Sequence, residues 1–186
     1  VDRLDENEFR QLLQDITDES ERFLEATALG NNLAFRSMLE RGLFAFTRKL
    51  AQLLDADRAS LFLREGDELV LKVAEHIQEM GEIRIPIGSG IAGAVAQSGE
   101  AIRIDDAYAD PRFNRDVDRQ TGYTTRSILS LPVKNMDGEV FAVAQLLNRR
   151  DGQPFDEHDE QRFSEFLQSL GVIFETQLDI SRRSAR

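Results

Sequence analysis

The sequence predicts one α+β domain, in which a six-stranded antiparallel sheet has helices on one face and a capped ligand pocket on the other. Three observations support this fold class. Apolar residues recur at helical spacing near both ends of the chain, six segments between them have strand character, and two turns are typical of hairpins. The 186 residues, 41% of them hydrophobic, are enough for one core with helical extensions.

Two helical patterns precede the strands. The first recurs at alternating steps of four and three residues: Phe9, Leu13, Ile16, Ser20, Phe23 and Thr27. The first 30 residues include nine acids and three bases, so this helix has a solvated face. We interpret residues 1–32 as an N-terminal signalling and dimerisation helix. A second apolar pattern runs from Leu33 to Leu53.

Six segments that follow are expected to form strands: residues 59–64, 68–75, 82–86, 101–104, 128–133 and 140–148. Gly66-Asp67 and Asp137-Gly138 are hairpin-turn signals between two pairs of them. We expect a short helix over residues 91–97, a polar lid with one or two helical turns over residues 110–122, and a long amphipathic helix after residue 154. Residues 33–178 are assigned to the domain and residues 179–186 to the end of a helical linker.

The composition narrows the possible partners. A formal net charge of −11 argues against a nucleic acid polymer or an anionic membrane, although one site can still be locally positive for a small anion. The chain has no cysteine, which excludes disulfides, thiolate metal sites and thioether-linked chromophores. We therefore expect no covalent cofactor, and we identify no candidate cluster of metal ligands in the sequence.

The sequence predicts neither a membrane-spanning segment nor a signal peptide. No apolar run approaches the roughly 20 residues that span a bilayer, and the first residues do not have the shape of a signal peptide. We expect no membrane insertion and a cytoplasmic location. Because the sequence lacks an initial Met and ends within a helical stretch, we interpret it as a piece of a longer protein whose output domain lies elsewhere.

Two segments contain groups suited to a phosphorylated ligand. Gly88-Ser89-Gly90 opens the helix of residues 91–97, and free N–H groups at a helix start favour a phosphate. A tight turn that needs positive φ angles is the alternative explanation. Residues 110–126 combine hydroxyls, carboxylates and an amide, which could bind a ribose, a phosphate and a base, or could form a solvated loop.

A third motif joins a strand end to a helix start. Asn148-Arg149 is followed by Phe155 and then by Asp159-Glu160. Arg149 and Asp159 can form a bidentate ion pair that holds the last helix against the sheet. The role of this motif would be structural.

These motifs together resemble one family. An Asn-Lys pair followed by Phe-x-x-x-Asp-Glu is the signature of the cyclic-nucleotide-binding GAF domains of phosphodiesterases and some bacterial adenylyl cyclases, and here Arg149 replaces the lysine. The resemblance extends over residues 33–178, through the segments 58–63, 90–93, 106–108, 110–113, 121–126 and 143–148. It implies a regulatory, non-catalytic fragment that binds cAMP or cGMP, cAMP being slightly favoured. Its occupancy would be relayed through the terminal helices to an adenylyl cyclase, a phosphodiesterase or another signalling enzyme.

The resemblance also implies a set of ligand-lining positions: Ser60, Ala74, Glu75, Ile91, Ala92, Asn114, Asp118, Thr121, Thr125 and Gln145. The helix-start amides would face the cyclic phosphate, and the lid and strand residues would hold the sugar and base. Two departures from relatives affect the base. Some relatives have an aromatic-acidic pair at positions 74 and 75, and some have glutamate at position 145, where the amide of Gln145 offers both a donor and an acceptor.

Other functions stay open as alternatives. A GAF domain with an empty pocket could act as a dimerising spacer or could bind another small ligand. The apolar faces of the predicted N- and C-terminal helices could pair in a homodimer, or they could cover the sheet of their own domain. For haem, the candidate ligands are His76 and His158, which form no cluster, and the adjacent acids at 105–106 and 156–157 lie in turn and cap contexts without a catalytic arrangement.

Overall fold

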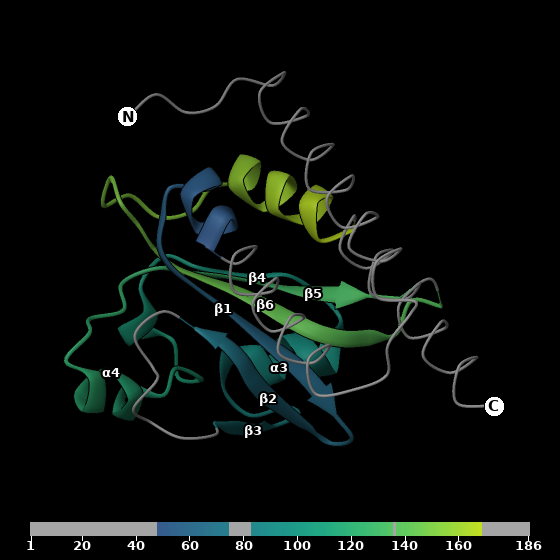
Figure 1. Ribbon diagram of the computed structural model, residues 1–186. Coiled ribbons are helices and arrows are strands. Elements are labelled where there is room, and N and C mark those ends of the chain that lie inside the picture. Colours follow the sequence, from purple (N-terminus) through teal and green to yellow (C-terminus); the bar gives the residue numbers. More distant parts are fainter. Residues whose placement is uncertain (1–47, 75–82, 136, 169–186) are drawn as a thin grey trace, which may run out of the picture.

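The computed structural model describes residues 48–74, 83–135 and 137–168 (Figure 1). Its elements in chain order are β1 (Ala56–Glu65), β2 (Glu68–Ala74), β3 (Arg84–Pro86), α3 (Gly90–Ser98), β4 (Ile102–Ile104), the 3-10 turn η1 (Ala107–Ala109), α4 (Arg115–Thr121), β5 (Ile128–Lys134) and β6 (Val140–Arg149). Helices also occupy residues 48–53 and 157–168. No helix in these described ranges is long and apolar enough to cross a membrane.

The six strands form one antiparallel sheet in the order β3-β2-β1-β6-β5-β4, which confirms the expected fold class. The long strands β1 and β6 are its centre, and the short strands β3 and β4 are its edges. The expected N-terminal helix of residues 1–32 and the linker end of residues 179–186 lie outside the described residues, as do Glu75 and His76.

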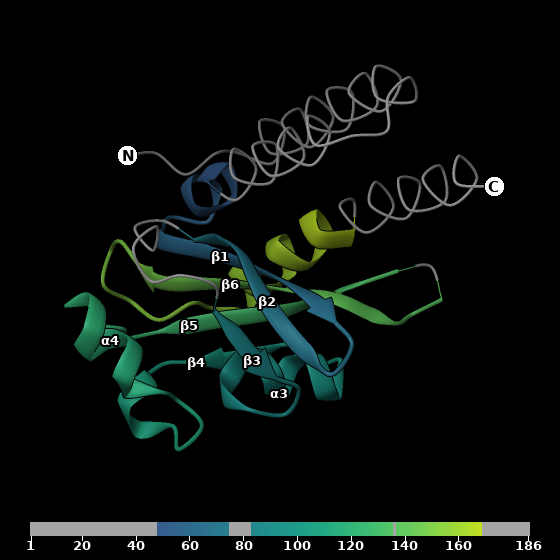
Figure 2. The same cartoon turned by 60° about the horizontal axis from the view of Figure 1, so that its bottom comes forward.

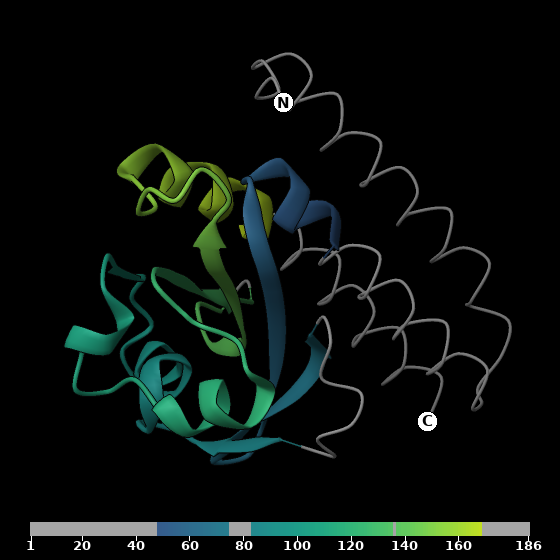
Figure 3. The ribbon, with the colours of Figure 1, turned by 90° about the vertical axis from the view of Figure 1, so that its left-hand side faces the viewer.

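Alternation along the central strands divides the core into two layers. Side chains of a strand point to opposite faces in turn, so Leu61 and Leu146 face one side and Phe62 and Val143 the other. The first face packs against the helices of residues 48–53 and 157–168, where Phe163 is fully buried. The second face packs against α3. Figures 2 and 3 show α3 and α4 on the opposite side of the sheet from those two helices.

A glycine-rich turn brings α3 close to the end of β3. Gly88 and Gly90 have φ angles of +86° and +64°, which side chains other than glycine rarely adopt. Gly93 lies against the same turn, because a Cβ on it would be 2.6 Å from the backbone oxygen of Pro86. The turn signal and the helix start expected from the sequence are therefore one packed unit.

Arg149 holds the C-terminal helix at the end of β6. Its Nη1 lies 2.9 Å from Asp159 and 3.4 Å from Asp156, and its Nη2 lies 2.8 Å from Asp151. The sequence suggested one bidentate pair with Asp159, whereas the guanidinium is shared among three carboxylates. Burial by itself would lower the pKa of Arg149, but the neighbouring carboxylates outweigh burial and raise it. The other signature residues pack beside this contact, with Phe155 buried and Glu160 2.9 Å from Arg103 of β4.

The close contact at Gly93 predicts a specific intolerance. Gly93→Ala should lower the free energy of unfolding by about 1–3 kcal/mol, because the new methyl group overlaps the backbone oxygen of Pro86. Denaturant unfolding of the domain measures the change. Ala94→Ser, at the next position of α3, is the control and should shift the midpoint little. An unchanged midpoint for Gly93→Ala would contradict the packing described here.

The shared guanidinium predicts how much the last helix depends on Asp159. Asp159→Asn should cost about 2 kcal/mol, because the side chains of Arg149 and Asp159 are 10% and 4% exposed and the lost partner is a buried charge. The two remaining aspartates limit the loss. Asp116→Asn removes a carboxylate from the exposed pair with Arg119 and should change stability much less. Equal effects of the two substitutions in thermal unfolding would refute a role for burial.

Candidate functional site

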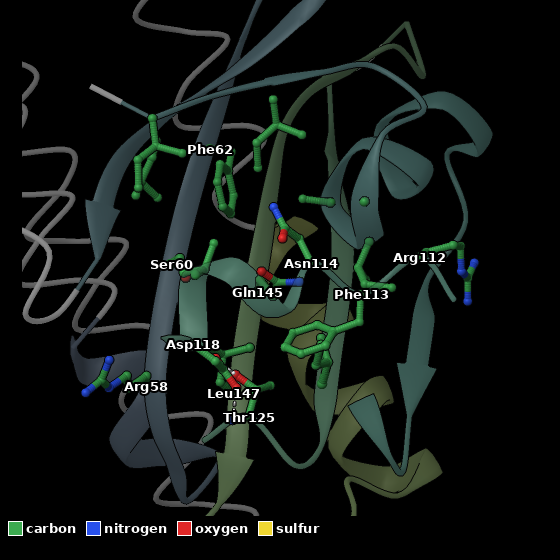
Figure 4. A pocket seen from close by; sticks show the side chains of 18 of the residues that line it. Arg58, Ser60, Phe62, Arg112, Phe113, Asn114, Asp118, Thr125, Gln145 and Leu147 are labelled. Carbon is green, nitrogen blue, oxygen red and sulfur yellow. Dashed lines mark hydrogen bonds between the residues drawn. The ribbon is translucent and has the colours of Figure 1, made fainter. Parts of the chain in front are cut away.

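A cavity of about 510 Å³ lies between the sheet and the segments that cover its second face (Figure 4). β1 and β6 form its floor with Ser60, Phe62 and Gln145. The start of α3 and the segment from Arg112 to Thr125 form its walls. This volume lies within the range that accommodates small ligands in proteins.

The structure brings together most of the positions that the resemblance implied. Eight of the ten line the cavity: Ser60, Ile91, Ala92, Asn114, Asp118, Thr121, Thr125 and Gln145. Ala74 pairs with Ser60 at the end of β2. Glu75 lies outside the described residues.

The N-terminus of α3 opens into the cavity. Its N-cap residue, Ser89, makes no side-chain capping hydrogen bond, and the first turn contains no acidic residue. The first N–H groups of a helix have no acceptor within the helix, and the helix dipole is positive at this end. Ile91 and Ala92 of this first turn line the cavity. This wall therefore favours a negatively charged group.

Three arginines lie around the cavity although the chain has a negative net charge. Among the described residues, the lining of the cavity includes Arg58, Arg84 and Arg112 and a single carboxylate, that of Asp118. Arg112 is paired with Asp110 at 2.7 Å, and Arg84 with glutamates of β1 and β2. Figure 4 shows Arg58 and Arg112 at the rim with their guanidinium groups directed outward. The carboxylates beside Arg84 and Arg112 offset the charges of these two arginines, so the N-terminus of α3 is the part of the wall that favours an anion.

Arg58 and Tyr123 form a clasp at the rim. The guanidinium of Arg58 lies 3.7 Å from the centre of the Tyr123 ring, and the Tyr123 hydroxyl donates a 2.8 Å hydrogen bond to Asp57. Burial, followed by the contact with Asp57, raises the pKa of the Tyr123 hydroxyl. Tyr123 follows α4, and the clasp thereby holds the end of the lid against β1.

Asp118 forms hydrogen bonds that hold the lid together on its inner side. It is 5% exposed and accepts hydrogen bonds from the backbone N–H of Thr125 at 2.6 Å and from the Thr125 hydroxyl at 2.8 Å. The Tyr108 hydroxyl donates a third at 3.1 Å, and burial together with Asp118 raises the pKa of Tyr108. Asp118 and Thr125 are thus at the cavity wall, but their polar groups mainly hold α4 against the segment that follows it.

Two further lid residues use their polar atoms in local structure. The Asn114 carbonyl oxygen accepts from the N–H of Asp116 as the N-cap of α4, and the Thr121 hydroxyl donates to the backbone oxygen of Val117. The Asn114 amide nitrogen has no hydrogen-bond partner among the described residues. Most polar atoms of the lid that were expected to bind a ligand thus form hydrogen bonds within the lid.

Asn148 fastens the far end of the lid to the sheet. Its Oδ1 accepts from the N–H groups of Arg126 at 2.6 Å and Ser127 at 3.2 Å, and its Nδ2 donates to the backbone oxygen of Thr124 at 2.8 Å. Asn148 is 1% exposed and has a φ of 52°, a conformation that asparagine adopts more readily than most residues. The segment between Thr125 and β5 is therefore fixed to the end of β6.

The polar side chains on the floor of the cavity form no hydrogen bonds within the part of the domain that the structure describes. Ser60 and Gln145 are directly opposite each other on β1 and β6 and both line the cavity. Within the described residues, neither side chain makes a hydrogen bond. A ligand on the floor would thus meet one hydroxyl and one carboxamide with free donors and acceptors.

Several lining residues were missing from the sequence-based set. Arg58 and Phe62 are two residues from Ser60, and Leu147 is two residues from Gln145, so strand alternation could have found them. Phe113 and Tyr123 reach the cavity through the folding of the lid, which local periodicity does not report. His158, weighed above as a haem ligand, is exposed at the start of the C-terminal helix.

The comparisons with known proteins agree on one family. The family model described as "GAF domain" matches residues 38–174. The dual 3',5'-cyclic-AMP and -GMP phosphodiesterase 11 of Drosophila melanogaster is 37% identical, with 97% of this chain and 14% of the relative covered. The cGMP-specific 3',5'-cyclic phosphodiesterase of the same species is 36% identical, with 95% and 17% covered. The chain thus spans less than a fifth of the length of these relatives.

Solved structures share the fold at low sequence identity. The GAF domain from a phosphoenolpyruvate-protein phosphotransferase of Coxiella burnetii has a TM-score of 0.72 and 21% identity, with 94% of this chain and 96% of that chain covered. The free methionine-R-sulfoxide reductase from Neisseria meningitidis has a TM-score of 0.65 and 22% identity, with 95% and 91% covered. From the family model, the relatives and the fold together, the chain belongs to the GAF domain family.

Proposed function

We propose that this domain is a regulatory sensor that binds a cyclic nucleotide in the cavity. The observation that carries the proposal is the uncapped N-terminus of α3 at one wall, with the free polar groups of Ser60 and Gln145 on the floor. A cyclic nucleotide has an anionic phosphate at one end and a base with donors and acceptors at the other. The names of the relatives, which are cyclic-nucleotide phosphodiesterases, support the same ligand class.

The binding mode follows from where charge and free polar groups lie. The cyclic phosphate would accept hydrogen bonds from the first N–H groups of α3, and the base would lie over the floor, within reach of Gln145. Phe62 and Phe113 line the cavity and offer aromatic surface to the base, in place of the aromatic residue that some relatives have at position 74. A slight preference for cAMP over cGMP stays a prediction.

The same geometry suggests how occupancy could reach the last helix. Asp118 and Thr125 join α4 to the segment that Asn148 holds, and the next residue, Arg149, holds the C-terminal helix. A ligand that favours one arrangement of the lid would thereby bias the position of that helix, provided that its affinities for the two arrangements differ. We propose that the helix passes this change to an output domain in the cytoplasm, an adenylyl cyclase, phosphodiesterase or other signalling enzyme, within a homodimer paired through the terminal helices.

The phosphate position can be tested with one pair of substitutions. Ser89→Asp places a carboxylate where the phosphate would bind, and it should lower the affinity for cAMP and cGMP by at least about a hundredfold. Asparagine has nearly the same shape as aspartate but no charge, so Ser89→Asn should retain the affinity within about threefold. Both residues are good N-caps, so both variants should be at least as stable as the wild type. Calorimetric titration of nucleotide-free protein measures the affinities.

The outcomes of this titration separate the candidate functions. Saturable binding by the wild type that is lost in Ser89→Asp but kept in Ser89→Asn supports a phosphate at α3. Equal binding by the two variants refutes that position. Absence of heat with either nucleotide in the wild type refutes the sensor proposal and favours a spacer role or another ligand.

The relay can be followed by hydrogen exchange. Adding cAMP or cGMP should slow amide exchange over residues 105–127 and also over residues 157–168, because the lid and the last helix are joined through adjacent residues of β6. In Arg149→Gln the effect should persist in the lid and weaken in the helix, since the charge-assisted contacts to the helix are lost. Protection confined to the lid in the wild type would contradict the relay.

A further inference from the structure

Three polar side chains form a row across the centre of the sheet. Gln145 of β6 is directly opposite Ser60 of β1 on one side and Ser130 of β5 on the other. Residues opposite each other in antiparallel strands point to the same face of the sheet, which here is the face with the cavity. Figure 4 shows Ser60 and Gln145 on the floor of that cavity. Gln145 is therefore flanked by two hydroxyl groups.

Ser130 differs from Ser60 in its surroundings. It is 0% exposed and does not line the cavity. Its Oγ has no hydrogen-bond partner among the described residues, which is unusual because buried hydroxyls in folded proteins nearly always have one. The Ser130 hydroxyl can therefore take a neighbouring polar side chain as its partner.

The strand register makes Gln145 a candidate for that partner, because it is directly opposite Ser130. Directly opposite residues have Cβ atoms about 5 Å apart, and the amide of a glutamine is two carbons beyond its Cβ. A change of side-chain rotamer would bring the amide to the Ser130 hydroxyl. The hydroxyl can accept from the amide nitrogen or donate to the amide oxygen, so it supports both orientations of the amide.

We propose that Ser130 is a positioning residue that supports Gln145 in either amide orientation, so that the domain binds both cAMP and cGMP with affinities within about tenfold of each other. This inference rests on the proposed function. Adenine presents a donor at its 6-amino group and an acceptor at N1, whereas guanine presents an acceptor at O6 and a donor at N1. A carboxamide pairs with the first pattern in one orientation and with the second after a flip.

The proposal predicts distinct effects on affinity and on base preference. Ser130→Ala should lower the affinity for both nucleotides by about three- to tenfold and leave their ratio nearly unchanged. Gln145→Glu, which has no donor, should shift the ratio toward cGMP by at least about tenfold, since a carboxylate accepts from guanine but opposes N1 of adenine. Ser98→Ala, at the end of α3, is the control and should change neither quantity.

The test is calorimetric titration with cAMP and cGMP, combined with thermal unfolding of each ligand-free variant. Ser130→Ala should unfold at a temperature no lower than the wild type, because it removes a hydroxyl without a partner. In a Gln145→Ala background, Ser130→Ala should have no further effect on affinity, which distinguishes positioning through Gln145 from a general structural role.

Three results would overturn the inference. One is a wild-type preference greater than about tenfold for either nucleotide, another is unchanged affinity in Ser130→Ala, and the third is an equal loss from Ser130→Ala with and without Gln145. A wild type that binds neither nucleotide would refute the proposed function itself. That result differs from these three, each of which requires measurable binding of at least one nucleotide.

Discussion

The arrangement of this domain depends on two adjacent residues at the end of β6. Asn148 has a positive φ, and its side chain and that of Arg149 contact different parts of the molecule. Asn148 holds three backbone groups of the segment that ends the lid, while Arg149 holds three carboxylates around the start of the C-terminal helix. Both are buried, so their polar groups need these partners. The cavity wall and the last helix are thus fixed to one point of the sheet.

The polar groups of the lid and those of the floor differ in whether they already form hydrogen bonds. Asp118 accepts three hydrogen bonds from its own lid and from η1, and such a saturated carboxylate has little capacity left for a ligand. The floor has the opposite character, because Ser60 and Gln145 lie on the two central strands with their polar atoms uncommitted. Groups on a rigid sheet are held more accurately than groups on a loop. In the binding mode that we propose, the floor therefore recognises the base and the lid covers the ligand.

The net charge of the chain does not describe the groups that surround its cavity. A charge of −11 spread over the surface is screened by salt within about 10 Å, whereas an enclosed site responds to the groups nearest to it. Those groups are the N-terminus of α3, the carboxylate of Asp118 and three arginines, two of which are paired with carboxylates. An acidic domain can therefore favour a small anion while repelling polyanions.

The sequence by itself determined the elements and their order. Strand and helix periods are local properties, so the six strands and α3 lie within a few residues of their expected bounds, and the family motifs led to eight of the residues around the cavity. Tertiary structure alone decided how the polar groups pair. The division of Arg149 among three aspartates, the closure of Asp118 on Thr125, the clasp of Tyr123 with Asp57 and the isolation of the Ser130 hydroxyl depend on distances between segments. Those distances are set by packing of the whole chain, which no local pattern of residues records.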